Sequence, residues 1–559
     1  MNVRVPRIFH ATLGNIHHAA FWLATFTIFS AFLGLIRDRF LASIFGASRE
    51  LDMYYAAFRV PDILYTVLLF FTASTAIIPI FLEAQNDSKE RSWRLLNSLI
   101  ISFTIFAFVG IGASFIGMPF FVKFLFPGFL PSEQASVAAL SRILLVSTFL
   151  LGLSNVFSSV TQAFRRFFAY ALSPILYNVG IIIGIIVFLP RFGLLGLAFG
   201  VVIGAFFHLA VQFPSLHNIK ISFVFGSIRN YDFWRVISLS LPRTLGLAIT
   251  QIVSTIFTGI ASSLAVGSIA VFTFASNLET IPVTLIGLSY SVAAFPNLAE
   301  LSLRGSRSEF QEHFSIAFRH ILFWTMPFVA LLLVLRAQIV RVILGAGAFS
   351  WADTRLTAAS LFLLSLAVVF QSLFMLFIRA FYAEGQTTRP VLINILSAFF
   401  SVASAFWFVQ LFENNDRFIG FVKLILKLNG IGDIRVLALP LGILIGSALN
   451  FIFLFFVFRI VFGWFPTHGI FGALGNIFVS SVFAGGAAYG GLQIFARIFD
   501  LTTFVGIFAQ GLFAGLAGII VWIIILWILR SRELEEIYLG MRHILWREHV
   551  PAPEPEKLP

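Results

Sequence analysis

The chain has 559 residues, of which 59% are hydrophobic and 11% charged, and its formal net charge is +12. Ordinary soluble domains carry about 25% charged residues, so this composition excludes a soluble protein and indicates a membrane protein. The sequence contains no cysteine, which excludes disulfides, a thiolate nucleophile and cysteine-ligated metal.

Apolar runs recur along the whole chain. About 20 apolar residues span a bilayer as one helix, and runs bounded by charges, proline or glycine predict fourteen spans here. They lie near residues 19–36, 56–82, 96–122, 136–162, 168–190, 193–214, 233–261, 266–298, 314–335, 356–378, 388–411, 436–458, 469–496 and 503–529. The expected fold is therefore an all-α polytopic membrane protein.

Four clusters of charged or polar residues lie in or beside these spans. In chain order they are Arg37, Asp38, Arg39 and Asp52; Arg59 and Asp62; Arg243; and Asn277 with Glu279. Charges inside a bilayer are costly and indicate function. One explanation for Arg37 and Arg39 is that they are interfacial anchors or form a salt bridge with Asp38. The competing explanation is an anionic lipid headgroup, because arginine favours bidentate pairing with phosphate.

Glu279 precedes Pro282 inside a predicted span. A proline there interrupts the helix and frees carbonyl groups, so Glu279 and Asn277 are candidates for coupling to a proton or a monovalent cation. The alternative is a packing glutamate that pairs with a neighbouring helix.

Two halves of the chain repeat. "PILYNVGIIIG" from Pro174 matches "PVLINILSAFF" from Pro390, and this match aligns Asn178 with Asn394. Further matches join "LGLI" to "LGLA", "GVVIGA" to "GILIGS" and "PIFLEA" to "PNLAEL", all in the same order. Six spans per copy predict a parallel repeat: lobes at 1–225 and 226–462 around a central cavity, followed by two additional helices at 463–530.

The segment 531–559 is expected to form a cytoplasmic amphipathic helix and a disordered tail. Its apolar residues recur at helical spacing, namely Leu534, Ile537, Tyr538, Met541 and Leu545. The distribution of lysine and arginine between spans places both termini in the cytoplasm. It also makes 412–435 the longest outer loop.

The sequence lacks the motifs of several enzyme and pump classes. It has no G-x-x-x-x-G-K-[ST] for ATP phosphates and no H-E-x-x-H for zinc. Its basic residues lie between spans and form no single face for nucleic acid. We therefore expect a transporter without a metal site or cofactor, driven by the membrane potential or a coupled monovalent cation.

Several stretches are similar to one protein family. "LGLIRDRFLASIFGASRELDMYYAAFRVPDIL" resembles the opening signature of the MviN/MurJ family of lipid II flippases, within the multidrug/oligosaccharidyl-lipid/polysaccharide exporter superfamily. "SPILYNVGIIIG", "FYAEGQTTRPVLIN" and the stretch from Leu241 also resemble it, collinearly over roughly 15–460. The resemblance implies two six-helix lobes plus two helices, a cationic cavity, and transfer of a polyprenyl-pyrophosphate-linked precursor to the outer leaflet.

The resemblance also suggests roles for single residues. It implies that Arg37 borders the cavity and that Asp52 belongs to the outer gate. We assign Arg37, Arg59 and Arg243 to substrate binding, and Asp38, Asp52 and Asp62 to gating.

The chain departs from the family where arginines are expected for the pyrophosphate, because it has Ala31, Tyr65 and Asn277 there. Phe70 and Phe71 replace an acidic-glycine pair, and Thr280 stands near the expected carboxylate.

The leading prediction is a bacterial inner-membrane flippase for a lipid II-like cell-wall precursor, acting in peptidoglycan biosynthesis by alternating access. One alternative is an exporter of another lipid-linked oligosaccharide or of amphipathic cations. The other is a non-transporting scaffold for envelope synthesis. The expected partners are the lipid-linked substrate, membrane lipids and envelope-synthesis enzymes.

Overall fold

The computed structural model describes residues 16–72, 74–164, 166–216, 231–463 and 470–545. Within these ranges, the side chains of 16–22, 24, 74, 75, 242, 243, 470, 471 and 540–545 are not described. The described residues form helices and no strand. The predicted tail beyond α21 lies outside them.

The helices of the first half are α1 (Ile16–Phe45), α2 (Arg49–Ala57), α3 (Arg59–Leu68), η2 (Leu69–Phe71), α4 (Ser74–Asp87), α5 (Lys89–Leu125), α6 (Pro131–Ala163), α7 (Phe167–Ile183), η3 (Gly184–Phe188), α8 (Leu189–Phe192), α9 (Leu194–Ala210) and α10 (Phe213–Leu216). Those of the rest are α11 (Tyr231–Ser262), α12 (Ser268–Pro282), η5 (Val283–Leu288), α13 (Ser289–Leu303), α14 (Arg307–Leu344), α15 (Trp351–Ala383), α16 (Thr388–Asn414), α17 (Asp416–Leu426), η6 (Arg435–Leu437), α18 (Ala438–Phe462), α19 (Ile470–Phe495), α20 (Phe504–Ile528) and α21 (Arg532–Leu545).

Thirteen helical segments of the described chain are long and apolar enough to cross a membrane. Each overlaps one of the spans predicted from residue 56 onward, and the 30-residue α1 covers the predicted span at 19–36. The prediction of an all-α polytopic membrane fold is confirmed. The segment predicted as the long loop at 412–435 contains a short helix, α17 (Asp416–Leu426).

Polar residues placed before the apolar runs start several helices. The side chains of Ser48, Ser88 and Thr503 accept hydrogen bonds from backbone N–H groups three residues later, at the starts of α2, α5 and α20. These N–H groups have no partner within the helix itself, so a side-chain oxygen at this position stabilises the first turn.

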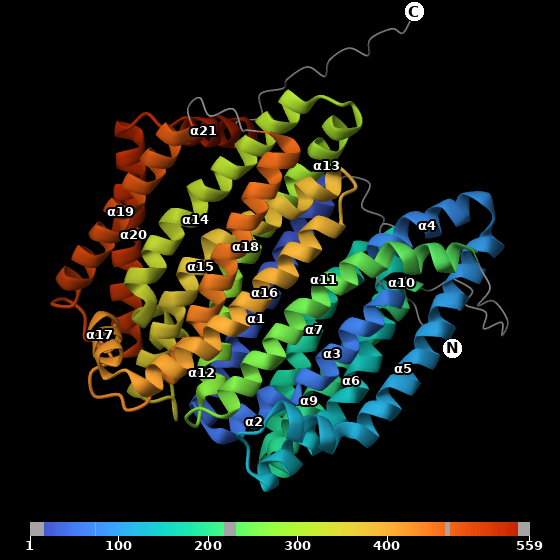
Figure 1. Ribbon diagram of the computed structural model, residues 1–559, viewed down its shortest axis with the longest axis horizontal. Coiled ribbons are helices and arrows are strands. Elements are labelled where there is room, and N and C mark those ends of the chain that lie inside the picture. The colour runs from blue at the N-terminus through green and yellow to red at the C-terminus, as the bar shows by residue number, and fades with distance from the viewer. Residues whose placement is uncertain (1–15, 73, 165, 217–230, 464–469, 546–559) are drawn as a thin grey trace, which may run out of the picture. The chain divides into compact units, whose positions relative to one another are not determined.

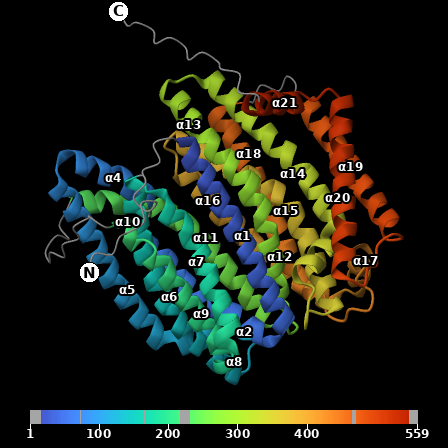
Figure 2. The ribbon, with the colours of Figure 1, turned by 180° about the vertical axis from the view of Figure 1, so that it is seen from behind.

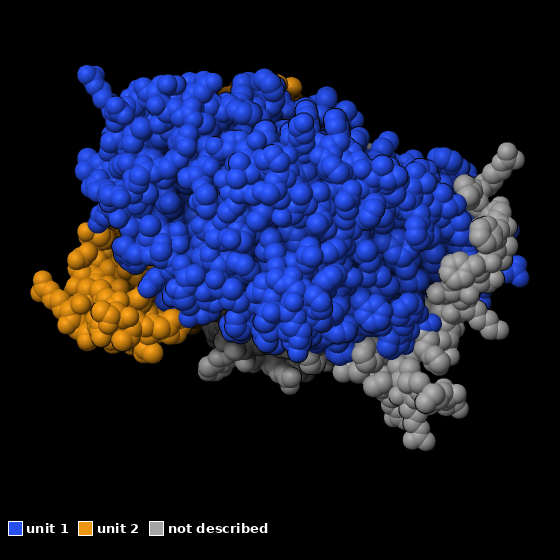
Figure 3. Space-filling view, turned by 90° about the horizontal axis from the view of Figure 1, so that it is seen from below, with its two compact units in different colours: residues 1–281, 340–367, 386–453 blue, residues 282–339, 368–385, 454–559 orange. Residues whose placement is uncertain are grey.

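The chain divides into two compact units (Figure 3). Unit 1 contains residues 1–281, 340–367 and 386–453, and unit 2 contains 282–339, 368–385 and 454–559. Four of the five divisions fall inside helices, namely α12, α14, α15 and α18, and the fifth lies between α15 and α16. The lobe boundaries at 225 and 462 stay a prediction from the sequence repeat.

Glycines set the closest helix crossing in unit 1. Within this unit α5, α6, α7 and α9 pack side by side (Figures 1 and 2). A Cβ atom on Gly180 would lie 2.2 Å from the Cα atom of Gly204, and one on Gly200 would lie 2.4 Å from that of Gly184. Only glycine allows the backbones of α7, η3 and α9 to approach this closely, as small-residue spacing predicts.

Unit 2 has an aromatic core that includes its last helix. Phe323 and Trp522 are buried, with ring centroids 4.9 Å apart, and Leu534 and Ile537 of α21 pack against their cluster. Arg319 of α14 binds Glu533 at 2.9 Å, and His320 lies 2.9 Å from Glu536. α21 lies across the ends of α19 and α20 (Figure 1), and these contacts attach it to the protein itself.

Candidate functional site

All eight predicted site residues belong to unit 1. The first of them, Arg37, lies inside α1, which continues to Phe45 instead of ending at the last apolar residue. Its Nε and Nη2 atoms donate to Asp38 Oδ1 at 3.0 and 2.8 Å. Its Nη1 atom donates to the side-chain oxygen of Asn178 on α7 at 3.3 Å. The helix continues because the two charges satisfy each other, which lowers the cost of placing them in an apolar region.

Asp38 connects this pair to α12. Its second oxygen accepts a hydrogen bond from Asn277 Nδ2 at 2.8 Å. The exposed fraction of the side chain is 4% for Asp38 but 24% for Arg37. The carboxylate is therefore enclosed, while part of the guanidinium remains accessible. We call Arg37, Asp38, Asn178 and Asn277 the central cluster.

Asn178 is held in place by its own helix and by α1. Its amide nitrogen donates to the backbone oxygens of Ser30 and Pro174 at 3.3 and 3.2 Å, and to Ser30 Oγ at 3.3 Å. These bonds fix its oxygen toward Arg37. The sequence aligned Asn178 with Asn394 but did not assign it to the site.

Arg39 points to a different neighbour. Its Nη1 atom donates to the backbone oxygens of Val342 and Ile343 at 2.6 and 3.3 Å. These are among the last carbonyls of α14, where a cation is favoured by the helix dipole. Next to this contact, the backbone N–H of Ala348 donates to the oxygen of Ser43 at 2.8 Å.

Asp52 caps α12 from a distant part of the chain. Its carboxylate is fully buried and accepts from the backbone N–H groups of Gly267 at 2.7 Å and Ala270 at 2.9 Å. Arg49, which lies on α2 as Asp52 does, pairs with Glu133 of α6 at 3.3 Å. Together with Arg39, these side chains tie the α1–α2 turn to α6, α12 and α14 within unit 1. We call this set of contacts the α1–α2 tie.

Arg59 and Asp62 begin α3, one turn apart. Arg59 Nη1 donates to Ser254 Oγ of α11 at 2.7 Å. Its Nε atom is buried without a hydrogen-bond partner among the described residues. Asp62 is half-buried. Arg59 therefore has an unused donor in the interior of unit 1, separate from the central cluster.

The last two predicted residues lie on α11 and α12. Arg243 is within α11, but its side chain lies outside the described residues. Glu279 is buried, with an exposed fraction of 6%. The predicted interruption at Pro282 is a π-helical segment, η5, after which the chain continues as α13.

The structure describes all three positions that lack the expected arginines, namely Ala31, Tyr65 and Asn277. The Tyr65 hydroxyl accepts a hydrogen bond from Asn155 Nδ2 of α6, and Ala31 is exposed. Asn277 uses its amide to bind Asp38. Neutral groups at two of these positions therefore make contacts with other side chains, and the central cluster contains one arginine and one aspartate.

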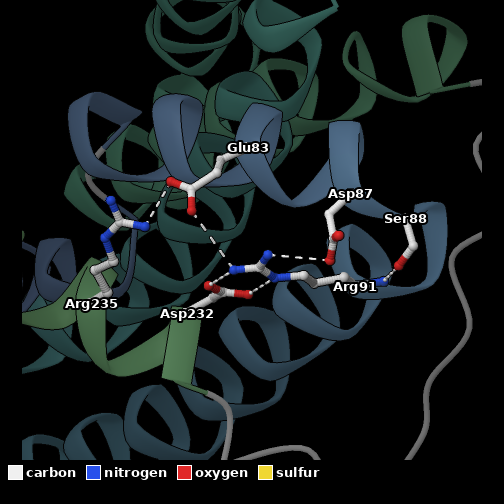
Figure 4. Close-up of polar contacts among 6 residues, drawn as sticks. All are labelled: Glu83, Asp87, Ser88, Arg91, Asp232 and Arg235. Atoms are coloured by element: carbon white, nitrogen blue, oxygen red, sulfur yellow. Dashed lines mark hydrogen bonds and ion pairs between the residues drawn. The ribbon is translucent and has the colours of Figure 1, made fainter.

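A second charged cluster joins α4, α5 and α11 (Figure 4). Arg91 Nε and Nη2 donate to the two oxygens of Asp232 at 2.7 Å each, and Arg235 Nη1 donates to Glu83 at 2.7 Å. Arg91 also donates to Asp87 at 3.3 Å. The hydrogen bonds from Arg91 hold the pKa of the Asp232 carboxyl below its ordinary value.

Comparison with known proteins finds one family. The family described as "Lipid II flippase MurJ" matches residues 41–510. A relative named "Probable lipid II flippase MurJ" from Buchnera aphidicola subsp. Schizaphis graminum is 30% identical over 396 residues, covering 69% of this chain and 76% of the relative. One of that name from Thermotoga maritima is 29% identical over 385 residues, covering 67% and 76%.

Solved structures share the fold. A lipid II flippase MurJ in an inward closed conformation superposes with a TM-score of 0.70 at 22% identity, covering 93% of this chain and 99% of that one. A multidrug resistance MATE family transporter in an inward-facing conformation gives a TM-score of 0.61 at 15% identity, covering 78% and 94%. The fold is therefore shared by transporters with different cargoes, and the cargo has to be argued from the site.

Proposed function

The chain belongs to the MurJ family of lipid II flippases, and we propose that it moves a lipid II-like, polyprenyl-pyrophosphate-linked cell-wall precursor from the inner to the outer leaflet. It is a multi-pass inner-membrane transporter and not an enzyme. The proposed route is alternating access between the two repeated lobes. The repeat in the sequence and the fold shared with MATE transporters support this route.

The central cluster is the observation that carries the proposal. Arg37 is partly accessible, and its orientation is fixed by Asp38 and Asn178. A guanidinium fixed in this way is suited to bidentate binding of a phosphate oxygen pair. Arg59, whose Nε is buried without a partner among the described residues, is the second proposed contact, and Arg243 is the third.

We assign gating to the α1–α2 tie and to the two other aspartates. For unit 1 to open at the α1–α2 turn, Asp52 has to release the N–H groups at the start of α12, and Arg39 has to release the carbonyls at the end of α14. Asp38 links α1 to α12 through Asn277, so motion of α1 relative to α12 breaks that bond as well. Asp62, one turn after Arg59, is the proposed gating partner at the entry of α3.

Coupling is proposed at Glu279 and Asn277. Glu279 is buried and lies one helical turn before the π-helical segment η5. Segments of this type occur often at functional sites. Either the membrane potential or a monovalent cation bound there would drive transport, without a cofactor. With both termini in the cytoplasm, α21 lies on the side where envelope-synthesis enzymes that supply the precursor would bind.

Reconstitution into proteoliposomes tests the proposed cargo and site. We expect lipid II to cross the bilayer and Arg37→Gln to slow its transfer about tenfold or more, because a charge-assisted hydrogen bond contributes about 1.5–3 kcal/mol. Arg142→Gln is the matched control, since Arg142 on α6 donates to the backbone oxygen of Phe115 outside the central cluster. If wild type and Arg37→Gln transfer lipid II at equal rates and have the same melting temperature, Arg37 is excluded from substrate binding.

A second cargo class is favoured by the charge balance of the central cluster. Asp38 neutralises Arg37, and Ala31, Tyr65 and Asn277 carry no charge. Such a site suits another lipid-linked oligosaccharide or an amphipathic cation better than a strongly cationic site would. Export of a fluorescent cation that is lost in Asp38→Asn, together with no transfer of lipid II, would favour this class over the first.

A further inference from the structure

The segment between α16 and α18 contains a helix with two apolar faces. On the inner face, Phe418 of α17 contacts Phe412 and Phe408 of α16, with ring centroids 5.0 and 6.2 Å apart. Phe421, Leu424 and Ile425 of the same helix are exposed by 60%, 70% and 50% and form its outer face. Their spacing of three and four residues places them on one side of the helix. The inner face explains why α17 folds against the protein, and the outer face is uncovered.

Both ends of α17 are fixed. Asn415 Oδ1 accepts from the backbone N–H of Phe418 at 3.0 Å and caps the start. At the other end Lys427 adopts a left-handed conformation with φ of 57°, and Leu428 N–H donates to the oxygen of Lys423 at 2.8 Å. Arg355 of α15 donates to the oxygen of Lys427. The exposed apolar face therefore belongs to an ordered element of unit 1.

The position of α17 along the chain places it at a membrane boundary. It directly follows α16, whose 27 residues rise about 40 Å. The hydrocarbon core is about 30 Å thick, so α16 crosses it completely before α17 begins. The extended backbone of Asn415 separates the two helices.

The charges of α17 complement phospholipid head groups. The helix and its cap contain three basic residues, Arg417, Lys423 and Lys427, against one acidic residue, Asp416. The two other carboxylates nearby, Glu413 and Asp433, are bound by Arg435 at 2.7 Å each. An exposed apolar face beside basic residues is typical of a helix that lies in the membrane interface.

From these observations we infer that α17 is an interfacial anchor whose Phe421–Leu424–Ile425 face inserts among phospholipid acyl chains while Arg417 and Lys427 bind lipid phosphates. The occupant of this face is the bilayer surface. A second copy of the chain would cover the same apolar residues but would leave the basic residues without phosphate partners.

The absence of native cysteine makes a direct test practical. Leu424→Cys in the full chain is labelled with a nitroxide and reconstituted in vesicles of phosphatidylethanolamine and phosphatidylglycerol. We expect its collision rate with oxygen, relative to that with a nickel chelate, to exceed the ratio at a matched Asn429→Cys label several-fold. Asn429 is exposed in the following turn and provides the control.

Equal ratios at the two labels would place α17 in water and overturn the inference. Dipolar broadening of the Leu424→Cys spectrum, removed by dilution with unlabelled protein, would assign the face to a second copy and overturn it as well. In Arg417→Gln/Lys427→Gln we expect the Leu424 label to lose the gain in depth that anionic vesicles give over phosphatidylcholine vesicles. An unchanged gain would remove the phosphate contacts from the inference.

Discussion

The two copies of the sequence repeat use the same kind of helix crossing with different partners. In the first copy, Gly184 of η3 faces Gly200 of α9, and a Cβ on either would lie 2.4–2.5 Å from the backbone of the other. In the second copy, a Cβ on Gly446 of α18 would lie 2.4 Å from the Cβ of Ser401 on α16. Both copies therefore retain close small-residue packing. The closest approach is in the first copy, where a Cβ on Gly180 would lie 2.2 Å from the Cα of Gly204.

The electrostatics of the two copies differ more than their packing. The match of "LGLI" with "LGLA" aligns the following Arg37 and Asp38 with Ile249 and Thr250, which carry no charge. Asn178 contacts Arg37 in the first copy, whereas Asn394 in the second accepts a hydrogen bond from Asn450 at 3.1 Å. Close packing is therefore common to both copies, whereas the charged side chains of the central cluster and of the α1–α2 tie lie in the first copy.

The largest effect is expected where a first-copy charge holds a second-copy helix. Asp52→Ala leaves the buried N–H groups of Gly267 and Ala270 without their acceptors, which costs about 1–3 kcal/mol for each group. We expect a clearly lower melting temperature in detergent. Ser48→Ala is the control, because it removes one 3.4 Å bond at the half-exposed start of α2. Similar melting of Asp52→Ala and wild type would show that the cap contributes little.

The closest helix crossing gives the next effect. In Gly200→Ala the new methyl group meets backbone atoms of Gly184 that cannot rotate away, and overpacking of this kind costs about 1–3 kcal/mol. Gly112→Ala on α5 is the control, because nothing lies within 4 Å of its Cβ position. If thermal melting ranks Gly446→Ala as more damaging than Gly200→Ala, the first copy is not the more tightly packed one.

The two aligned asparagines separate transport from stability. Asn178→Ala removes a hydrogen bond to Arg37, so we expect transfer of lipid II to fall about fivefold, which corresponds to about 1 kcal/mol. Asn394→Ala removes only its contact with Asn450 and is expected to leave transfer near the wild-type rate. If both variants slow the transfer of lipid II equally at matched stability, the bond from Asn178 to Arg37 has no special role in transport.

The sequence predicted the helices well and their partners poorly. Apolar runs located the spans because burial in lipid demands them, but the end of α1 was set too early since Arg37 and Asp38 neutralise each other inside the helix. The partners of Asp52 lie 215 and 218 residues away, and no local pattern identifies such pairs. α17 was missed because its length is below that of a span, although Asn415 and the spacing of Phe418 and Val422 carried a helix signal.

The smallest effect concerns the charges that join the first copy to α11, where the second copy begins (Figure 4). Asp232 lies before the membrane-spanning part of α11, and bonds from Arg91 lower the pKa of its carboxyl. A carboxyl whose pKa is lower in the folded state stabilises the fold above its unfolded pKa of about 3.9, and this contribution is lost as the pH falls through the folded value.

We expect the melting temperature to drop between about pH 5 and pH 3 more in wild type than in Asp232→Asn. The difference corresponds to about 1 kcal/mol or less, because Arg91 is partly exposed and solvent screens the pair. Parallel pH profiles of the two proteins would mean that the Arg91–Asp232 pair adds no stability here and that the apolar contacts of α4, α5 and α11 hold this junction.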